Sequence, residues 1–350
     1  MTKTKTSRIS VREIARAAGY SKSTVGDALK NKTGVNKSTR EHILSVAEAL
    51  GYVPDPRIAS WMARVQEAKS KDLLPIAWLN TDPEENCWHK YKFNTPYLIG
   101  AQERAMQLGY RLKEMWLHEP EMSMRRMARI LRHQGIEGVV VAPSAYHLRL
   151  DWEHLAAVSM GGILLAPRLH KIMVDFFYNL VLALKMVKRV GYSRIGICLP
   201  EYMDRGMNRS IHAAAHYFHG TTPKLKKVPP LFYHEAIDGD WSVEKGQIIP
   251  WLSRHRPDVI VCHNSKMVAC LEEAGVRVPE DIGVVHFSTD DDVSDWAGIS
   301  SNRRDVGDLA VQTVASLMRV RQFGLPQSPG ITFIRGTWHP GRTLLIPKPK

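Results

Sequence analysis

The stretch that decides the reading of this chain is ISVREIARAAGYSKSTVGDALKNKTGVNKSTREHILSVAEALGY, Ile9–Tyr52. Apolar residues recur at helical spacing in three short runs, which predicts helices over 11–18, 21–29 and about 36–50. Residues typical of helix starts and stops flank these runs: Ser10, Ser21, Asn36 or Ser38, Gly19 and Gly51. Two short helices joined by a tight glycine-containing turn form a helix-turn-helix, whose second helix enters the major groove of DNA.

Three motifs carry a resemblance to a known family: ISVREIARAAGYSKSTV (9–25), VNKSTREHI (35–43) and ALGYVPDP (49–56). They resemble the DNA-binding domain of the lactose-repressor (LacI) family. The resemblance implies a dimeric, effector-responsive transcription factor that consists of three parts along the chain. These are a headpiece at 1–53, a hinge helix with its linker at 54–72, and a core similar to periplasmic sugar-binding proteins at 73–350.

The residues expected to contact operator DNA lie in the headpiece and hinge: Ser10, Ser21, Lys22, Ser23, Thr24, Asp27, Asn31, Lys37, Arg57, Trp61 and Met62. Lys22 and Ser23 open the reading helix and are the first candidates for base contact, with Asp27 third. Where the family usually continues Ser-Arg, this chain has Gly26 and Asp27. An aspartate cannot bind guanine bidentately, but it can accept a hydrogen bond from cytosine N4 or repel a phosphate. We therefore expect an operator that differs from the family's common one.

Two residues of the reading helix have alternative interpretations. Gly26 costs about 1 kcal/mol relative to Ala inside a helix, which indicates either close approach of another backbone or a helix stabilised by docking. Thr24 either caps and packs the helix or contacts a phosphate.

The hinge segment opens with Pro54 and Pro56, which suit the exit from one helix and the first turn of another. The family inserts a Leu into the minor groove, and the matching position here is Trp61, beside Met62. An indole is large enough to unstack a base step. Alternatively, Trp61 packs between two hinge helices or against the core.

Positive charge is concentrated at the start of the chain. The 350 residues carry a net charge of +13, and residues 1–71 contain 14 Lys and Arg against 6 Asp and Glu. This distribution is the expected footprint of phosphate binding.

The cysteines and the hydropathy of the chain indicate the cellular compartment in which the protein is expected. Four cysteines without a C-x-x-C pair are typical of a reducing compartment. The first ten residues do not form a signal peptide, and no long apolar run is present. We therefore expect a cytoplasmic protein without a membrane partner, and this disfavours a periplasmic binding protein.

From Pro75 onward, short apolar runs alternate with helical segments that end in glycine, as in parallel sheets covered on both faces. Strands are expected over 76–79, 111–117, 138–142 and 161–166, and then over 194–199, 231–234, 258–262 and 282–287. A break at 167–171 separates two doubly wound subdomains. The predicted N-subdomain spans about 73–168 plus 303–326, and the C-subdomain about 169–302 plus 327–350. The resemblance implies that a helix at 305–320 returns to the first subdomain and that 330–346 crosses back.

A small-molecule effector, a sugar or a related metabolite, is expected between these subdomains. The candidate contacts combine strand-end positions with the family's pattern: Trp78, Asn80, Arg205, Asn264, Ser288, Asp290 and Arg304. Asn264 matches a family Asn, but Ser265 replaces the Asp that follows it. Ser288 and Thr289 replace the family's Asp-Asp pair. These substitutions put the usual free-sugar ligand in doubt.

Other constellations have competing interpretations. His212, His216 and His219 share one helical face, either as a zinc site or as a solvated surface. The run Asp290–Asp292 either binds a cation or borders the effector site, and any of the tryptophans is either core or a stacking surface. Phosphate-binding and nucleophile motifs are absent, so we expect no cofactor and no enzyme. A hydrolase or isomerase and an effector-independent architectural DNA binder remain the alternatives, and the tail without heptads favours a homodimer.

Overall fold

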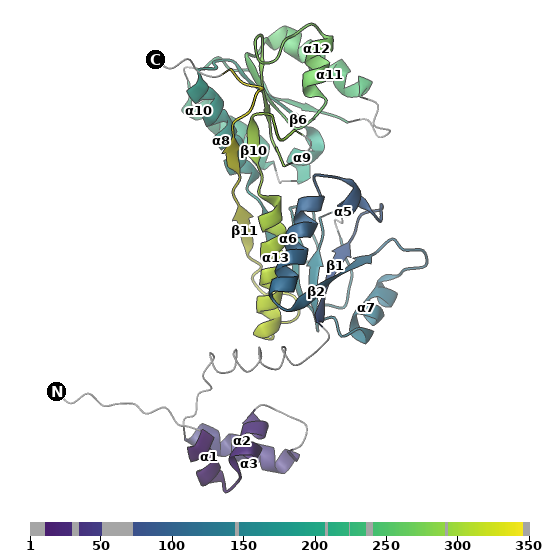
Figure 1. Ribbon diagram of the computed structural model, residues 1–350, viewed down its shortest axis with the longest axis vertical. Coiled ribbons are helices and arrows are strands. Elements are labelled where there is room, and N and C mark those ends of the chain that lie inside the picture. The colour runs from purple at the N-terminus through teal and green to yellow at the C-terminus, as the bar shows by residue number, and fades with distance from the viewer. Residues whose placement is uncertain are drawn as a thin grey trace, which may run out of the picture. The chain divides into compact units, whose positions relative to one another are not determined.

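A computed structural model describes residues 11–29, 35–50, 73–143, 147–206, 209–223, 225–235, 241–290 and 293–345. The chain divides into a first unit, 1–72, and a second unit, 73–350 (Figure 1). The predicted hinge at 54–72 lies outside the described residues. Within the described ranges, no helix has the length and apolar character needed to cross a bilayer.

The first unit contains three short helices, α1 (Val11–Ala18), α2 (Lys22–Leu29) and α3 (Lys37–Ala49). Ile14, Val25 and Ile43, one from each helix, are completely buried against one another, and smaller alanines fill the remaining space. Asn36 caps α3, because its Oδ1 accepts a hydrogen bond of 2.8 Å from the Thr39 N–H. The three helices that the sequence predicts are therefore confirmed, together with one of the two proposed caps of the third.

The first lobe of the second unit is a parallel sheet in the order β11-β5-β4-β3-β1-β2. Helices α6 and α13 cover one face and α7 covers the other, while α5 follows β1 (Figure 1). Its elements are β1 (Leu74–Asn80), α5 (Cys87–Lys90), α6 (Thr95–Gln107), β2 (Tyr110–Trp116), α7 (Met124–His133), β3 (Gly138–Val141), β4 (Ala156–Met160), β5 (His170–Val174), α13 (Arg303–Arg319) and β11 (Ile331–Ile334).

The second lobe is a sheet in the order β12-β10-β9-β8-β6-β7, in which only β12 is antiparallel to its neighbour among the paired strands described. Helices α8 and α10 pack on one face, and α11 and α12 pack on the other. Its elements are α8 (Phe176–Val190), β6 (Ile195–Pro200), α9 (Glu201–Gly206), α10 (Ser210–Thr221), β7 (Leu231–Tyr233), α11 (Ser242–His255), β8 (Val259–Cys262), α12 (Met267–Glu273), β9 (Gly283–His286), β10 (Gly298–Ser300) and β12 (Thr337–His339).

The prediction of two doubly wound lobes is confirmed, but three details of it are wrong. The strand expected at 161–166 is instead β4 at Ala156–Met160, and the expected break contains β5. Both β5 and β11 pair in the first sheet, so the subdomain boundaries placed at 168 and 326 come too early. The physical reason is that β5 and β11 are stabilised by pairing with each other across about 160 residues, which local periodicity does not reveal.

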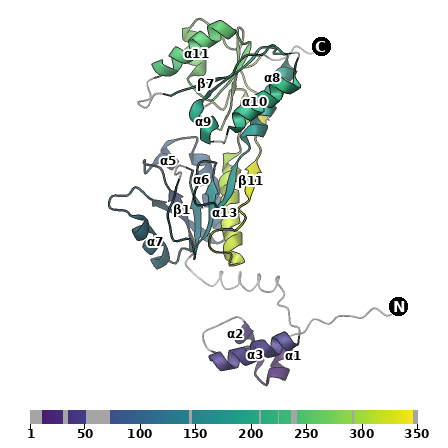
Figure 2. The same cartoon turned by 180° about the vertical axis from the view of Figure 1, so that it is seen from behind.

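The chain crosses between the lobes three times, and hydrogen bonds join these crossings. The Asp175 N–H donates to the Ile334 oxygen at 2.8 Å. Asn302 Nδ2 donates to the Arg335 oxygen at 2.9 Å. The last crossing therefore contacts both of the others. After the second crossing α13 packs against α6 and β4 of the first lobe (Figure 2), which confirms the expected return of the long helix.

Candidate DNA-reading helix and effector site

Helix α2 is held by its own cap and by its buried face. Ser21 Oγ accepts a hydrogen bond of 3.1 Å from the Thr24 N–H, and the two hydroxyl oxygens lie 2.8 Å apart. Val25 and Ala28 face the core, and Lys22 is exposed. The capping role expected for Ser21 is therefore present, and the Thr24 hydroxyl takes part in the same cap.

Gly26 has no packing reason to be glycine within the described part of the first unit. A Cβ built at this position meets no heavy atom within 4 Å, and its backbone conformation is one that any residue adopts in a helix. Asp27 follows it and is half-buried. Whatever favours a glycine here therefore comes from outside the described residues.

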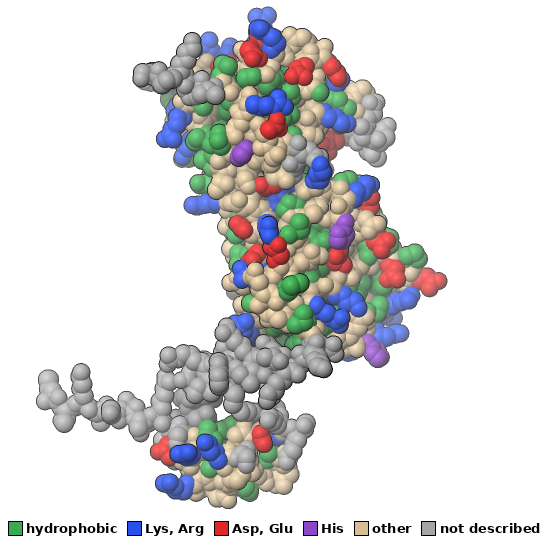
Figure 3. Space-filling view, viewed as in Figure 1, with side chains coloured by type: hydrophobic (Ala, Val, Ile, Leu, Met, Phe, Trp, Pro, Cys, Tyr) green, Lys and Arg blue, Asp and Glu red, His purple; other side chains and the backbone are tan. Residues whose placement is uncertain are grey.

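The remaining DNA candidates are distributed over the headpiece and the predicted hinge. Ser10, Asn31, Arg57, Trp61 and Met62 lie outside the described residues. Ser23 and Lys37 are located on α2 and α3, but the structure does not describe their side chains. Figure 3 shows several of the described Lys and Arg side chains on one face of the first unit.

The register of the second sheet brings predicted effector residues together at its carboxyl edge. Cys262 of β8 pairs with His286 of β9 and both strands end there, so Asn264 and Ser288 each lie two residues beyond the carboxyl end of two neighbouring strands. Asp290 lies beyond them and accepts hydrogen bonds from Ser300 Oγ at 2.6 Å and from the Ser301 N–H at 2.7 Å. The Asp290 carboxylate is therefore already bonded to Ser300 and Ser301, the residues that lead into α13.

Two histidines that the prediction did not include lie beside this row. The rings of His263 and His286 stack with their centroids 5.3 Å apart. His286 Nδ1 lies 2.5 Å from the Ser288 oxygen, and Trp296 meets the same imidazole edge-on at 5.9 Å. The Ser288 N–H also lies 3.2 Å from this nitrogen, so Nδ1 makes both contacts with the Ser288 backbone, and Nε2 has no hydrogen-bond partner among the described residues.

Arg303, the first residue of α13, connects this row to the first lobe. Its side chain is only 6% exposed. Nη1 donates a hydrogen bond of 2.9 Å to the Phe93 oxygen, and the guanidinium lies 5.8 Å from the Phe93 ring and 5.9 Å from the Tyr97 ring. The buried cation thus lies at the start of α13, directly after the chain has crossed from the second lobe, and contacts the first lobe through Phe93.

We refer to His263, His286, Ser288, Ser301 and Arg303 as the strand-end cluster. Four of its polar atoms are buried without a hydrogen-bond partner among the described residues: His263 Nδ1, His286 Nε2, Ser288 Oγ and Ser301 Oγ. A buried polar atom left unsatisfied costs about 1–3 kcal/mol, so native proteins rarely gather several of them. Such a concentration is typical of a site that receives a polar ligand.

Electrostatics keep both imidazoles of this cluster neutral. Burial lowers the pKa of His286 to about 4, and the Arg303 charge lowers it further, although the contact with the Ser288 backbone opposes this. Burial also holds the pKa of His263 well below its usual value, with smaller contributions from His286 and Arg303. The free cluster therefore holds one cation and two neutral rings that resist protonation.

Three other predicted contacts lie outside this cluster. Trp78 is completely buried in the first lobe, where its ring meets Trp88 edge-on at 5.0 Å. Asn80 is 3% exposed, and its amide binds the following loop, accepting from Trp88 Nε1 at 3.1 Å and donating to the Glu85 oxygen at 2.8 Å. Arg304 is exposed and forms an ion pair with Glu103 of α6. Since residues 303 and 304 point about 100° apart on a helix, Arg303 takes the inward position that the prediction gave to Arg304.

Arg205 is exposed on α9, and the neighbouring acid is used internally. Asp204 is completely buried and accepts hydrogen bonds from the Ile211 and His212 N–H groups at 3.1 and 3.0 Å. It also contacts His212 Nδ1, whose ring stacks on Phe232 at 3.8 Å. His212 is therefore oriented by a carboxylate, and no group of acids, histidines or cysteines suited to a metal occurs among the described residues.

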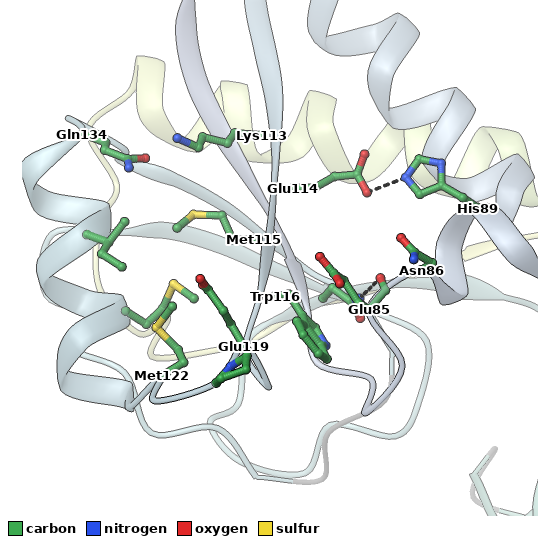
Figure 4. A pocket seen from close by; sticks show the side chains of 14 residues that line it. Glu85, Asn86, His89, Lys113, Glu114, Met115, Trp116, Glu119, Met122 and Gln134 are labelled. Atoms are coloured by element: carbon green, nitrogen blue, oxygen red, sulfur yellow. Dashed lines mark hydrogen bonds and ion pairs between the residues drawn. The ribbon is translucent and has the colours of Figure 1, made fainter.

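A separate cavity of about 520 Å³ opens on the first lobe beside the edge strand β2 (Figure 4). Glu85, Glu114 and Glu119 line it together with Trp116, and His89 bonds Glu114 at 2.8 Å. None of the side chains lining it has a buried polar atom without a partner. Because the unsatisfied buried atoms are in the strand-end cluster and not in this cavity, we take the strand-end cluster as the effector site candidate.

Comparisons with known proteins agree with this architecture. Residues 10–55 match the bacterial regulatory proteins, lacI family, and residues 184–337 match the periplasmic binding protein-like domain. The HTH-type transcriptional repressor PurR of Photobacterium profundum is 25% identical over 304 residues, which covers 80% of this chain and 82% of that protein. The sucrose operon repressor of Escherichia coli is 23% identical over 299 residues, covering 79% and 83%.

Solved structures show the same fold. The CelR transcriptional regulator in complex with cellobiose has a TM-score of 0.58 at 14% identity, covering 96% of this chain and all of that one. The Lac repressor dimer bound to operator and the anti-inducer ONPF has a TM-score of 0.55 at 17% identity, covering 97% of this chain and all of that one. A helix-turn-helix unit followed by a two-lobed, periplasmic-binding-protein-like unit defines a class of DNA-binding transcriptional regulators that respond to a small molecule. This chain belongs to the LacI family of that class.

Sequence reasoning missed His263, His286, Ser301 and Arg303. One signal was available, because His286 interrupts an apolar strand where the family has glycine. A histidine at the end of a buried apolar strand is a polar group among apolar ones, so it is a candidate for a site. No comparable signal distinguished Arg303 from Arg304.

Proposed function

We propose that this chain is a repressor that binds a pseudo-palindromic operator as a homodimer in the cytoplasm, and that a small molecule at the strand-end cluster changes its operator affinity. The observation that supports this most directly is the combination of a capped reading helix with a buried, partly unsatisfied polar cluster where the lobes meet.

The proposed reading surface is the exposed side of α2. Lys22 and Asp27 lie on the side away from Val25 and Ala28, and Gly26 between them leaves room for another backbone. A recognition helix contacts base edges through such residues, while lysines and the helix start contact phosphates. The expected contacts at Ser10, Asn31, Lys37, Arg57, Trp61 and Met62 stay part of this proposal.

The proposed effector contacts combine predicted and newly located residues. Asn264 and Ser288 keep their predicted roles, Asp290 positions Ser300 and Ser301, and Arg303 replaces Arg304. An effector shifts operator affinity only by as much as it prefers one arrangement of the lobes, typically about 1–3 kcal/mol. Because Arg303 contacts the first lobe from the start of α13, a ligand beside it would bear on both lobes.

A homodimer supplies two reading helices for the two half-sites of an operator. The name of one structural relative describes a dimer on operator DNA, and this supports the same assembly here. The relatives reported above are repressors, which supports a regulator without catalytic turnover over the hydrolase or isomerase alternative.

A deletion and a binding selection test this function. Binding-site selection from random DNA with the full chain is expected to return a two-fold symmetric site. Residues 73–350 alone are expected to fold, to remain dimeric and to lose specific DNA binding. A full chain that selects no consensus, or that binds all DNA equally, would support the architectural alternative instead.

A further inference from the structure

One extended segment near the end of the chain forms an outer edge of both sheets. β11 is the outermost strand at one side of the first sheet, and β12 is the outermost strand at one side of the second. Only Arg335 and Gly336 separate the two strands in the chain, and none of the strands described in this unit lies outside either of them. Residues 331–339 therefore provide strand edges in both lobes (Figure 1).

The backbone of β11 presents hydrogen-bonding groups on its outer side. The Asp175 N–H donates to the Ile334 oxygen at 2.8 Å, so the carbonyl group of residue 334 faces the neighbouring strand β5. Backbone groups alternate in direction along a strand, so Thr332 also faces β5, whereas the N–H and C=O groups of Ile331 and Phe333 point away from the sheet. A further strand could therefore pair with β11 through these two residues.

The side chains of β11 do not protect this edge. Ile331 and Phe333 lie on the same face of the strand and are 54% and 51% exposed, and Thr332 between them is exposed as well. Natural edge strands commonly carry a charged residue or a proline that prevents pairing with another chain. The strand ITFI has neither, so its exposed apolar edge is typical of a surface that another polypeptide covers.

The charge along this edge is positive. Residues 309–350, which include β11 and β12, contain six Lys and Arg and no Asp or Glu. Residues 156–174, which include β4 and β5, contain Arg168 and Lys171 and again no Asp or Glu. Arg168 is exposed, and the side chain of Arg335, directly after β11, is 69% exposed although it lies 3.7 Å from Asp175. A partner that complements this charge is therefore acidic.

We propose that β11 binds an extended, acidic segment of another protein, which joins the first sheet as an additional strand. The backbone groups of Ile331 and Phe333 form the hydrogen bonds, and their side chains contact alternate residues of the segment. Its carboxylates face Arg168 and Arg335. A second copy of this chain complements the edge less well, because it brings the same positive charge, and nucleic acid has no backbone that pairs with a strand. This docking surface is separate from the strand-end cluster and from α2, so it does not rest on the proposed function.

Hydrogen exchange of single amides in the unaltered full-length protein tests the addition of a strand. The probe is a soluble peptide of about eight residues in which Glu and Val alternate, and the control peptide has Lys in place of Glu. The acidic peptide should slow exchange of the Ile331 and Phe333 amides by about tenfold or more. The Thr332 amide should keep its rate, because it already faces β5, and the Lys peptide should slow none of the three.

Surface variants locate the bound peptide, and fluorescence anisotropy of a labelled peptide measures their affinities. Phe333→Glu should weaken binding of the acidic peptide by about tenfold or more, because it replaces an apolar contact with a like charge. Arg335→Gln should weaken it about two- to fivefold, the value of one exposed ion pair. Arg319→Gln is the matched control, since it removes an exposed charge from the end of α13 and should leave binding unchanged.

Several outcomes would overturn the proposal. The first is unchanged exchange at Ile331 and Phe333 in the presence of the acidic peptide, and the second is equal protection by the Lys peptide. Protection that increases with protein concentration and needs no peptide would identify a second copy as the occupant. Protection by duplex DNA of unrelated sequence, without protection by the peptide, would identify nucleic acid. The exchange measurement needs no variant, so a Phe333→Glu protein that misfolds does not remove the test.

Discussion

Arg303 donates a hydrogen bond of 2.9 Å from Nη1 to the backbone oxygen of Phe93, which joins the start of α13 to the segment between α5 and α6 of the first lobe. The same guanidinium lies over the Phe93 ring and is nearly removed from solvent. A charged hydrogen bond in such surroundings is worth more than an exposed ion pair, because water does not screen it. The adjacent Arg304 offers an exposed comparison in the same turn.

Arg303→Met should lower the free energy of unfolding of the second unit by about 1–3 kcal/mol, since it removes the hydrogen bond and the aromatic contacts of a buried cation. Arg304→Met, which removes only the exposed pair with Glu103, should cost less than about 1 kcal/mol. Urea unfolding followed by tryptophan fluorescence measures both, because eight of the nine tryptophans lie in residues 73–350. Equal losses in the two variants would contradict the structural difference between the residues.

Acid should weaken the second unit before the carboxylates titrate. The His286 pKa of about 4 in the folded protein lies below its unfolded value of about 6.5, so the unfolded state binds the proton more readily. Stability from this group is present above pH 6.5 and is lost as the pH falls toward 4, by roughly 3 kcal/mol at most. His263 adds a loss of the same sign.

Unfolding free energies between about pH 7 and pH 4 check this expectation, and His286→Gln should reduce the slope in that window. The titration of Asp281, which pairs with Arg277, does not affect this window. Its pKa is about 2, so it changes the free energy of unfolding only at lower pH. A slope in His286→Gln as steep as that of the native chain would show that the buried imidazole is not responsible.

Gly26→Ala should have opposite effects on stability and on DNA binding. A Cβ at Gly26 meets nothing within 4 Å, so the substitution should stabilise α2 by up to about 1 kcal/mol through helix propensity. If DNA approaches this backbone closely, specific affinity should fall at the same time. Thermal unfolding and operator binding of one preparation measure the two effects, and an increase in both would show that the glycine makes no room for DNA.

Asp27→Arg should change base preference at one position of each half-site, because a guanidinium binds guanine bidentately and a carboxylate cannot. Each such contact discriminates by about 1–3 kcal/mol, which binding-site selection resolves easily. Asp27→Asn is the control for loss of charge alone. Identical consensus sites for the native chain and the Arg variant would exclude a reading role for this residue.

Local sequence patterns determined where several helices of this protein lie and where they end. The spacing of Ile14, Val25 and Ile43 is enough to predict three packed helices, because helix periodicity and capping act over only a few residues. Helix α8 also follows from its local sequence, since its apolar face ends at Gly191, a glycine in the left-handed conformation. The family motifs at 9–25, 35–43 and 49–56 also determine the class of regulator.

Only the tertiary structure decided the membership of β5 and β11 in the first sheet and the inward direction of Arg303 rather than Arg304. Strand pairing joins segments about 160 residues apart, and the two arginines differ by a single step of helix rotation, so neither leaves a local pattern. The pairing of His263 with His286 depends in turn on the register of β8 against β9. Local forces specify the elements, whereas long-range packing determines which side chains meet.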